Sequence, residues 1–121
     1  MSDSILTSTK KNLGIVEAYE VFDADITMHI NSAFSTLNQL GVGPEQGFMI
    51  EDKTALWSQF LEGDLRLNNV KSYVYLRVRL LFDPPGTSFA IASFKDQIEE
   101  LEWRINTQRE DVKWTEKMPT E

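Results

Sequence analysis

Cysteine is absent from the 121 residues, and histidine occurs once, as His29. The absence of cysteine excludes disulfide scaffolds, cysteine-ligated zinc and thiol nucleophiles, and a single histidine does not make a metal site. No uncharged apolar run approaches the roughly 20 residues of a membrane helix, and residues 1–11 lack the apolar core of a signal peptide. We therefore expect an intracellular, soluble protein without membrane contact, in which His29 has a structural role.

Positive charge is also scarce. The chain has 12 Lys and Arg against 19 Asp and Glu, which gives a net charge of −7. Proteins bind phosphate backbones through lysine and arginine, so tight binding to nucleic acid is not expected. An acidic surface would instead allow DNA to slide past without sticking, because like charges repel.

The sequence offers no constellation of nucleophile and base. Glu99, Glu100 and Glu102 could be imagined as an acid and a base, but they fall on the expected solvent side of a helix, with no pocket to shift their pKa values. The glycines of residues 41–44 resemble a phosphate-binding loop only superficially, because no lysine follows in the required arrangement. We therefore predict a protein that is not an enzyme and has no cofactor and no metal.

Apolar residues recur at steps of three and four in several segments, which is the spacing of one face of an α-helix. We expect a first helix over residues 4–13 with Ser4 as its N-cap, and a second helix capped by Asp23 or Asp25. Its exposed face should carry small polar residues, namely Thr27, Asn31, Ser35 and Asn38. Asp52 can cap a third, short helix, whose buried face is formed by Trp57, Phe60 and Leu61.

The most apolar segment, residues 65–82, predicts the longest helix, placed in the middle of the fold. Residues 83–86 include two prolines and must reverse the chain, and Thr87 or Ser88 then caps a last helix that ends near Asn106. The buried seam of this last helix should consist of Ile91, Phe94, Ile98, Leu101 and Ile105. The predicted fold is an all-α bundle of four to five helices with a long central helix.

After residue 106 the apolar pattern ends, so we predict a helical domain over residues 1–106 and an extended C-terminal tail over residues 107–121. Trp103 lies off the seam, and Trp114 is surrounded by charged residues. Tryptophan is enriched where partners meet, although Trp114 could also fold back on its own domain. The predicted partner or oligomer interface consists of Trp103, Arg109, Val112, Trp114 and Met118.

Residues 29–44, 71–85 and 98–104 together resemble the small head-tail connector (adaptor) proteins of long-tailed bacteriophages and related prophages. The resemblance extends from about Leu13 to Ile105, and its motifs are structural rather than catalytic. It implies a helical-bundle fold, in agreement with the periodicity.

The resemblance further implies a virion protein that assembles in the bacterial host cytoplasm and forms a ring, commonly of twelve subunits. The ring would dock beneath the portal protein, contact a downstream neck or tail-completion protein, and let genomic DNA pass through its channel without specific binding. In that family a C-terminal extension commonly reaches the neighbouring portal. Residues 107–121 would take this role here, with a reach of about 50 Å if extended.

Two other classes of function compete with this interpretation. One is a small acidic regulatory or binding module, such as a protein–protein inhibitor or a DNA mimic, which a monomeric or dimeric state in solution would favour. The other is a small hydrolase, for which the sequence lacks a reactive centre.

Overall fold

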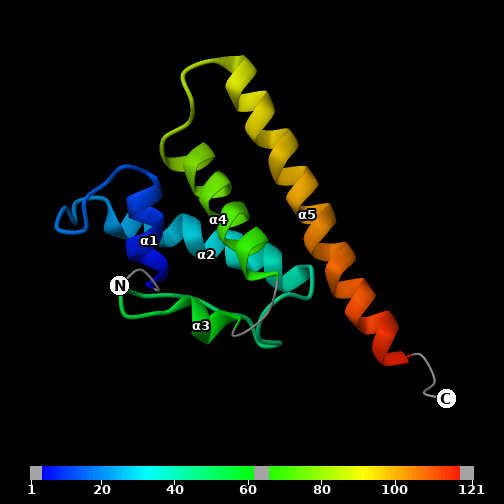
Figure 1. The fold of residues 1–121 in the computed structure, drawn as a ribbon. Coiled ribbons are helices and arrows are strands. Elements are labelled where there is room, and N and C mark those ends of the chain that lie inside the picture. Colours follow the sequence, from blue (N-terminus) through cyan, green and yellow to red (C-terminus); the bar gives the residue numbers. More distant parts are fainter. Residues whose placement is uncertain (1–3, 62–65, 118–121) are drawn as a thin grey trace.

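The computed structural model describes the backbone of residues 4–61 and 66–117, and the side chains of these residues as far as residue 107. The described residues form five helices and no β-strand; Ser4 and Leu56 make one isolated β-bridge. The helices are α1 (Ile5–Asn12), α2 (Asp23–Gln39), α3 (Trp57–Phe60), α4 (Leu67–Phe82) and α5 (Ser88–Lys117) (Figure 1). The predicted all-α bundle is confirmed.

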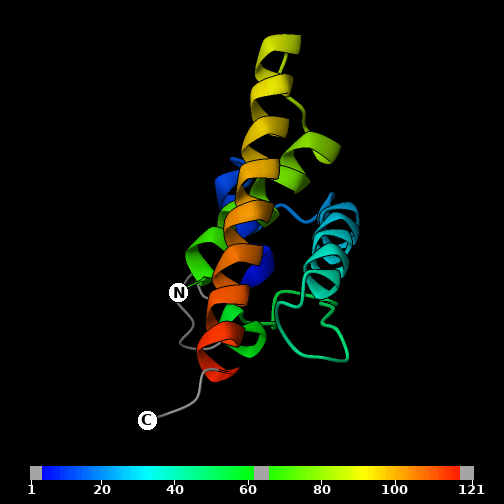
Figure 2. The same ribbon diagram turned by 90° about the vertical axis from the view of Figure 1, so that its right-hand side faces the viewer.

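Helix α4 occupies the centre of the fold, as its apolar composition predicts. It contacts α1, α2 and α5, and Val70, Tyr73, Val74 and Val78 are fully buried. Helix α5 runs beside α4 in the opposite direction, as Figures 1 and 2 show from two sides. The expectation that the central helix is the longest is wrong, because α4 has 16 residues and α5 has 30.

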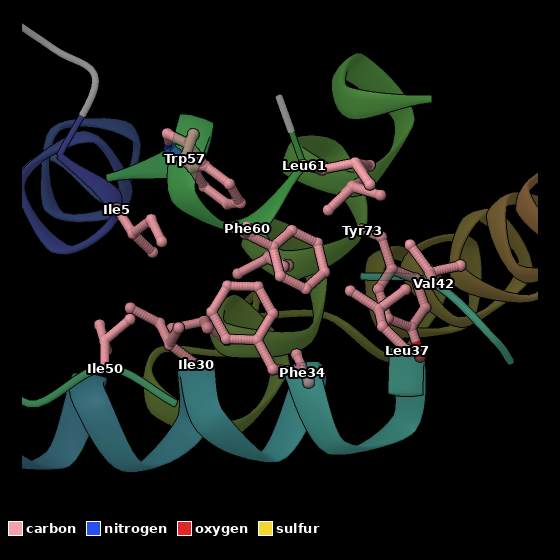
Figure 3. Packing of buried hydrophobic residues seen from close by; sticks show 14 of the residues in the cluster. Ile5, Ile30, Phe34, Leu37, Val42, Ile50, Trp57, Phe60, Leu61 and Tyr73 are labelled. Carbon is pink, nitrogen blue, oxygen red and sulfur yellow. The ribbon is translucent and has the colours of Figure 1, made fainter. Parts of the chain in front are cut away.

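Four aromatic rings form the part of the core under the loop that follows α2. The ring of Phe34 lies 4.6 Å from that of Phe60 and meets Trp57 edge-on, at 6.1 Å between ring centroids (Figure 3). It also meets the ring of Phe48 edge-on, at 5.4 Å. Offset and edge-on contacts of this kind are favourable because the positive ring edge meets a negative ring face. The predicted burial of Trp57, Phe60 and Leu61 is confirmed.

The side chain of Asn31 attaches the same loop to α2. Its amide Nδ2 donates to the carbonyl of Ile50 at 3.0 Å, and the amide N–H of Ile50 donates to its Oδ1 at 2.8 Å. Asn31 was expected on a solvent-exposed face, but it is half-buried. Its side-chain amide binds the backbone N–H and carbonyl of Ile50, as the backbone of a neighbouring strand would. This paired contact fixes where the apolar end of the loop lies.

Two of the predicted helix caps are present. The Ser4 hydroxyl accepts from the amide of Thr7 at 3.2 Å at the start of α1, and the Thr87 hydroxyl accepts from the amide of Ala90 at 3.1 Å at the start of α5. These contacts satisfy amides that the first turn of a helix leaves without a carbonyl partner.

The caps predicted for α2 and α3 are wrong. Phe22 precedes α2 without a side-chain cap, and Asp23 instead pairs with the buried Lys10 of α1, at 2.8 Å from its Nζ. Asp52 accepts from Thr54 within a turn, and α3 begins only at Trp57. Asp23 therefore has a partner on another helix and Asp52 a partner within its own turn, and helical spacing reveals neither.

The C-terminal segment is helical where an extended tail was expected. Helix α5 does not end near Asn106 but continues to Lys117, so the extended conformation is wrong for residues 107–117. Among the described residues, no helix combines the length and the apolar character needed to cross a membrane.

Candidate assembly surface

A polar network fixes α5 against α2 and α4. The Tyr73 hydroxyl donates to Glu102 Oε2 at 2.7 Å, and Arg77 Nη1 donates to the Tyr73 hydroxyl at 2.9 Å and to Thr36 Oγ1 at 3.1 Å. The same guanidinium nitrogen lies 4.0 Å from Glu102 Oε2. Glu102 was expected on the solvent side of the last helix; instead it is half-buried and takes part in this network.

Burial and, secondarily, the hydrogen bond to Glu102 raise the pKa of Tyr73 from its usual 10 to about 12. The folded state therefore holds this proton more tightly than the unfolded state. Its contribution to stability is complete below pH 10 and is lost as the pH rises from 10 to 12.

Replacing Tyr73 with phenylalanine removes this titration. We expect the stability advantage of the wild type over Tyr73→Phe to be constant below pH 10 and then to shrink by about 1.4 kcal/mol per pH unit. Urea unfolding of both proteins between about pH 8 and pH 11.5 measures the difference. A difference that stays the same across this range would contradict the assignment.

The predicted apolar seam also holds α5 in place. Ile105 is fully buried, and Ile98 and Leu101 pack against the core. Nearer the start of α5, the guanidinium of Arg79, in the last turn of α4, lies 5.6 Å from the centre of the Phe94 ring. Seam and network together fix the rotation of α5 about its own axis, and so determine which residues face away from the bundle.

Trp103 faces outward as a consequence. It follows Glu102 directly, and successive residues of an α-helix differ by about 100° around the axis. With Glu102 held by Tyr73, the Trp103 side chain is 66% exposed. The predicted position of Trp103, off the seam and accessible, is confirmed.

The other predicted interface residues stay predictions. Arg109, Val112 and Trp114 lie on the backbone of α5, but their side chains are outside the described part, and Met118 lies outside the described residues altogether. Trp103 lies on the same continuous helix as Arg109, Val112 and Trp114.

Sequence reasoning missed several exposed apolar side chains. Phe89, Met28, Met49 and Leu81 are all exposed. Phe89 and Met28 had a usable signal, because each precedes a residue of an apolar seam by two positions and so falls on the far side of its helix. Met49 had none, since its exposure depends on how the loop folds.

Within the described ranges, no three His, Asp or Glu side chains lie together as a metal site. His29 is half-buried on α2.

The comparisons with known proteins agree with the geometry. The family model of the phage connector proteins matches residues 5–112, from the start of α1 into the last part of α5. No curated protein and no solved structure matches the chain. The family match covers most of the chain, so the protein belongs to the phage connector family and is a structural phage protein of the head–tail junction.

Proposed function

We propose that this connector forms a ring, expected to contain twelve subunits, that docks beneath the portal and continues the DNA channel toward the tail. Family membership implies assembly with portal and tail proteins and a place in the virion. Assembly would take place in the host cytoplasm, and a neck or tail-completion protein would bind the opposite side of the ring. The role is structural and needs neither a cofactor nor a reactive centre.

The projection of α5 is the observation that carries the proposal. At 1.5 Å per residue, the 30 residues of α5 are about 45 Å long, against about 24 Å for the 16 residues of α4. Both ribbon views show the C-terminal end of α5 extending past the bundle (Figures 1 and 2). A short isolated helix is only marginally stable in water, so a projecting end gains most from a partner that covers it.

Residues 107–121 would act as the arm that docks on the portal. The proposed contact residues are Trp103, Arg109, Val112, Trp114 and Met118. Because residues 107–117 are helical, they span about 16 Å rather than the distance an extended chain would cover. The portal surface would therefore have to lie close to the connector domain.

The acidic charge fits the passage of DNA. A net charge of −7 opposes specific binding to a phosphate backbone, since such binding requires neutralising cations. DNA would then move through the channel without being held.

Electron microscopy of the connector mixed with its cognate portal tests the proposal. We expect an additional ring on the tail-facing side of the portal, with the same rotation axis. Portal particles that look unchanged at saturating connector, with all connector left free in solution, would contradict it.

A further inference from the structure

Two stretches of the connector sequence lack charge. The two longest stretches without Lys, Arg, Asp or Glu are residues 26–44 and residues 84–94, in a chain of which 26% is charged. The first covers most of α2 and the start of the loop after it, and the second covers the turn before α5 and its first residues. Interface cores are depleted in charged residues, and both stretches carry exposed apolar side chains, Met28 in the first and Phe89 in the second.

The first stretch forms one side of a groove. This groove has a volume of about 600 Å³ and runs between α2 and residues 46–49, and none of its lining residues is charged. Met49 is 73% exposed and Met28 is also exposed, whereas Phe34 is buried beneath them. Polar but uncharged side chains complete the lining, among them Ser35, Asn38 and Gln46.

The second stretch forms a protruding tip. Phe89, in the first turn of α5, is 85% exposed and is the most exposed of the large apolar side chains described. The start of α5 stands clear of the end of α4, as both views show (Figures 1 and 2). A tip with an aromatic side chain can enter a concave surface that a flat face cannot fill.

We infer that the tip of one connector subunit inserts Phe89 into the uncharged groove of a neighbouring copy. This inference rests on the proposed ring. A closed ring needs two different surfaces on each chain, because its contacts are head-to-tail. The tip and the groove satisfy this need, since the start of α5 and residues 46–49, which line one side of the groove, lie apart in both views (Figures 1 and 2).

The chemistry of the two surfaces agrees with this pairing. Neither surface contains a charge that would have to be desolvated on contact, and burying an unpaired charge is costly. Methionine sulfur makes favourable contacts with aromatic rings, and the flexible side chains of Met28 and Met49 can adapt to the shape of Phe89. A charged partner would find no opposite charge among the lining residues of the groove.

Disulfide trapping tests the contact, and the absence of native cysteine makes it clean. The full-length variant with Ser88→Cys and Gln46→Cys keeps Phe89, Met28 and Met49, and it should form a ladder of dimers, trimers and larger species under mild oxidation. Each single variant should give dimers at most. The control pair Val16→Cys and Gln46→Cys places the first cysteine at a side chain that is 70% exposed and away from the tip, and it should give no ladder. A ladder of equal strength in the control, or none in the test pair, would overturn the inference.

A charge substitution gives an independent measure. Phe89→Asp should weaken self-association in sedimentation experiments at least about tenfold, whereas Val16→Asp should change it less than about twofold. Both positions are exposed, so the melting temperature should stay the same in both variants. An equal effect of the two substitutions would contradict a specific role of Phe89.

Failure of this inference is distinguishable from failure of the proposed function. If the wild type forms a ring on the portal but the test pair gives no ladder, the tip-to-groove contact is wrong and the ring stands. If the ladder forms but the portal is never occupied, the contact stands and docking on the portal is wrong.

Discussion

A connector that ends at Glu110 is expected to fold and melt like the full-length protein but to lose its binding to the portal. Ile105 is the last described residue buried in the core, and five residues of helix would still follow it. The truncation removes Val112, Trp114 and Met118, and tryptophan side chains often dominate binding energy. We expect an affinity for the portal at least about 100-fold weaker.

Circular dichroism melting and a portal pull-down measure the two effects separately. A chain that ends at Lys117 is the matched control, because it keeps all of α5 and removes only Met118 and the three residues after it. It should retain most of the binding if Trp114 is the main anchor. A fall of many degrees in the melting temperature of the shorter chain would show that residues 111–121 belong to the folded domain.

Replacing Gly43 with alanine is expected to lower the free energy of unfolding by about 2–4 kcal/mol. Gly43 has φ +88°, a backbone conformation that costs an L-residue about 1–2 kcal/mol. A Cβ at this position would also overlap the ring of Phe60. That ring is packed among Phe34 and Phe48 and has little room to move, so the clash adds to the backbone cost.

Gly14→Ala is the control for this prediction. Gly14 has a similar φ of +83°, but a Cβ there would meet nothing within 4 Å. We expect a loss of only about 1 kcal/mol, from the backbone conformation alone. Chemical denaturation of both variants gives the comparison, and equal losses would show that the ring of Phe60 yields without cost.

The helices that bury one face were predictable, because burial leaves a periodic trace in the sequence. The apolar stripe of α2 is one example, and Ile26, Ile30, Phe34 and Leu37 are buried as predicted. The seam of α5 is confirmed in part: Ile105 is buried and Ile98 and Leu101 pack against the core, whereas Ile91 and Phe94 are only half-buried. Gly43 shows the limit of such reasoning. Its position in a loop was evident from the sequence. The ring of Phe60, which leaves no room for a Cβ at Gly43, lies 17 residues further along the chain, and its place depends on how that segment folds back.

The end of α5 was missed for a different reason. The prediction followed the apolar seam and ended the helix where the seam ends, at residue 106. Residues 107–117 contain neither glycine nor proline, and six of the eleven are Arg, Glu, Lys or Gln, which favour a helix. Intrinsic propensity therefore extends the helix beyond the part that the core requires.

The candidate site was predictable only in part. Trp103 was placed correctly because its position off the seam is a property of the helix alone. The inward position of Glu102 depends on a tyrosine 29 residues earlier in the chain, so spacing within α5 placed it with the exposed carboxylates. The groove beside Met49 depends on the path of the loop after α2, which the sequence does not specify by periodicity.

Removing the connector from the virus shows whether it joins heads to tails. The measurement is electron microscopy of lysates from the encoding phage with the connector gene deleted. We expect separate DNA-filled or emptied heads and free tails, with joined particles restored when the wild-type connector is supplied from a plasmid. Normal numbers of tailed particles in the deletion strain would contradict the account.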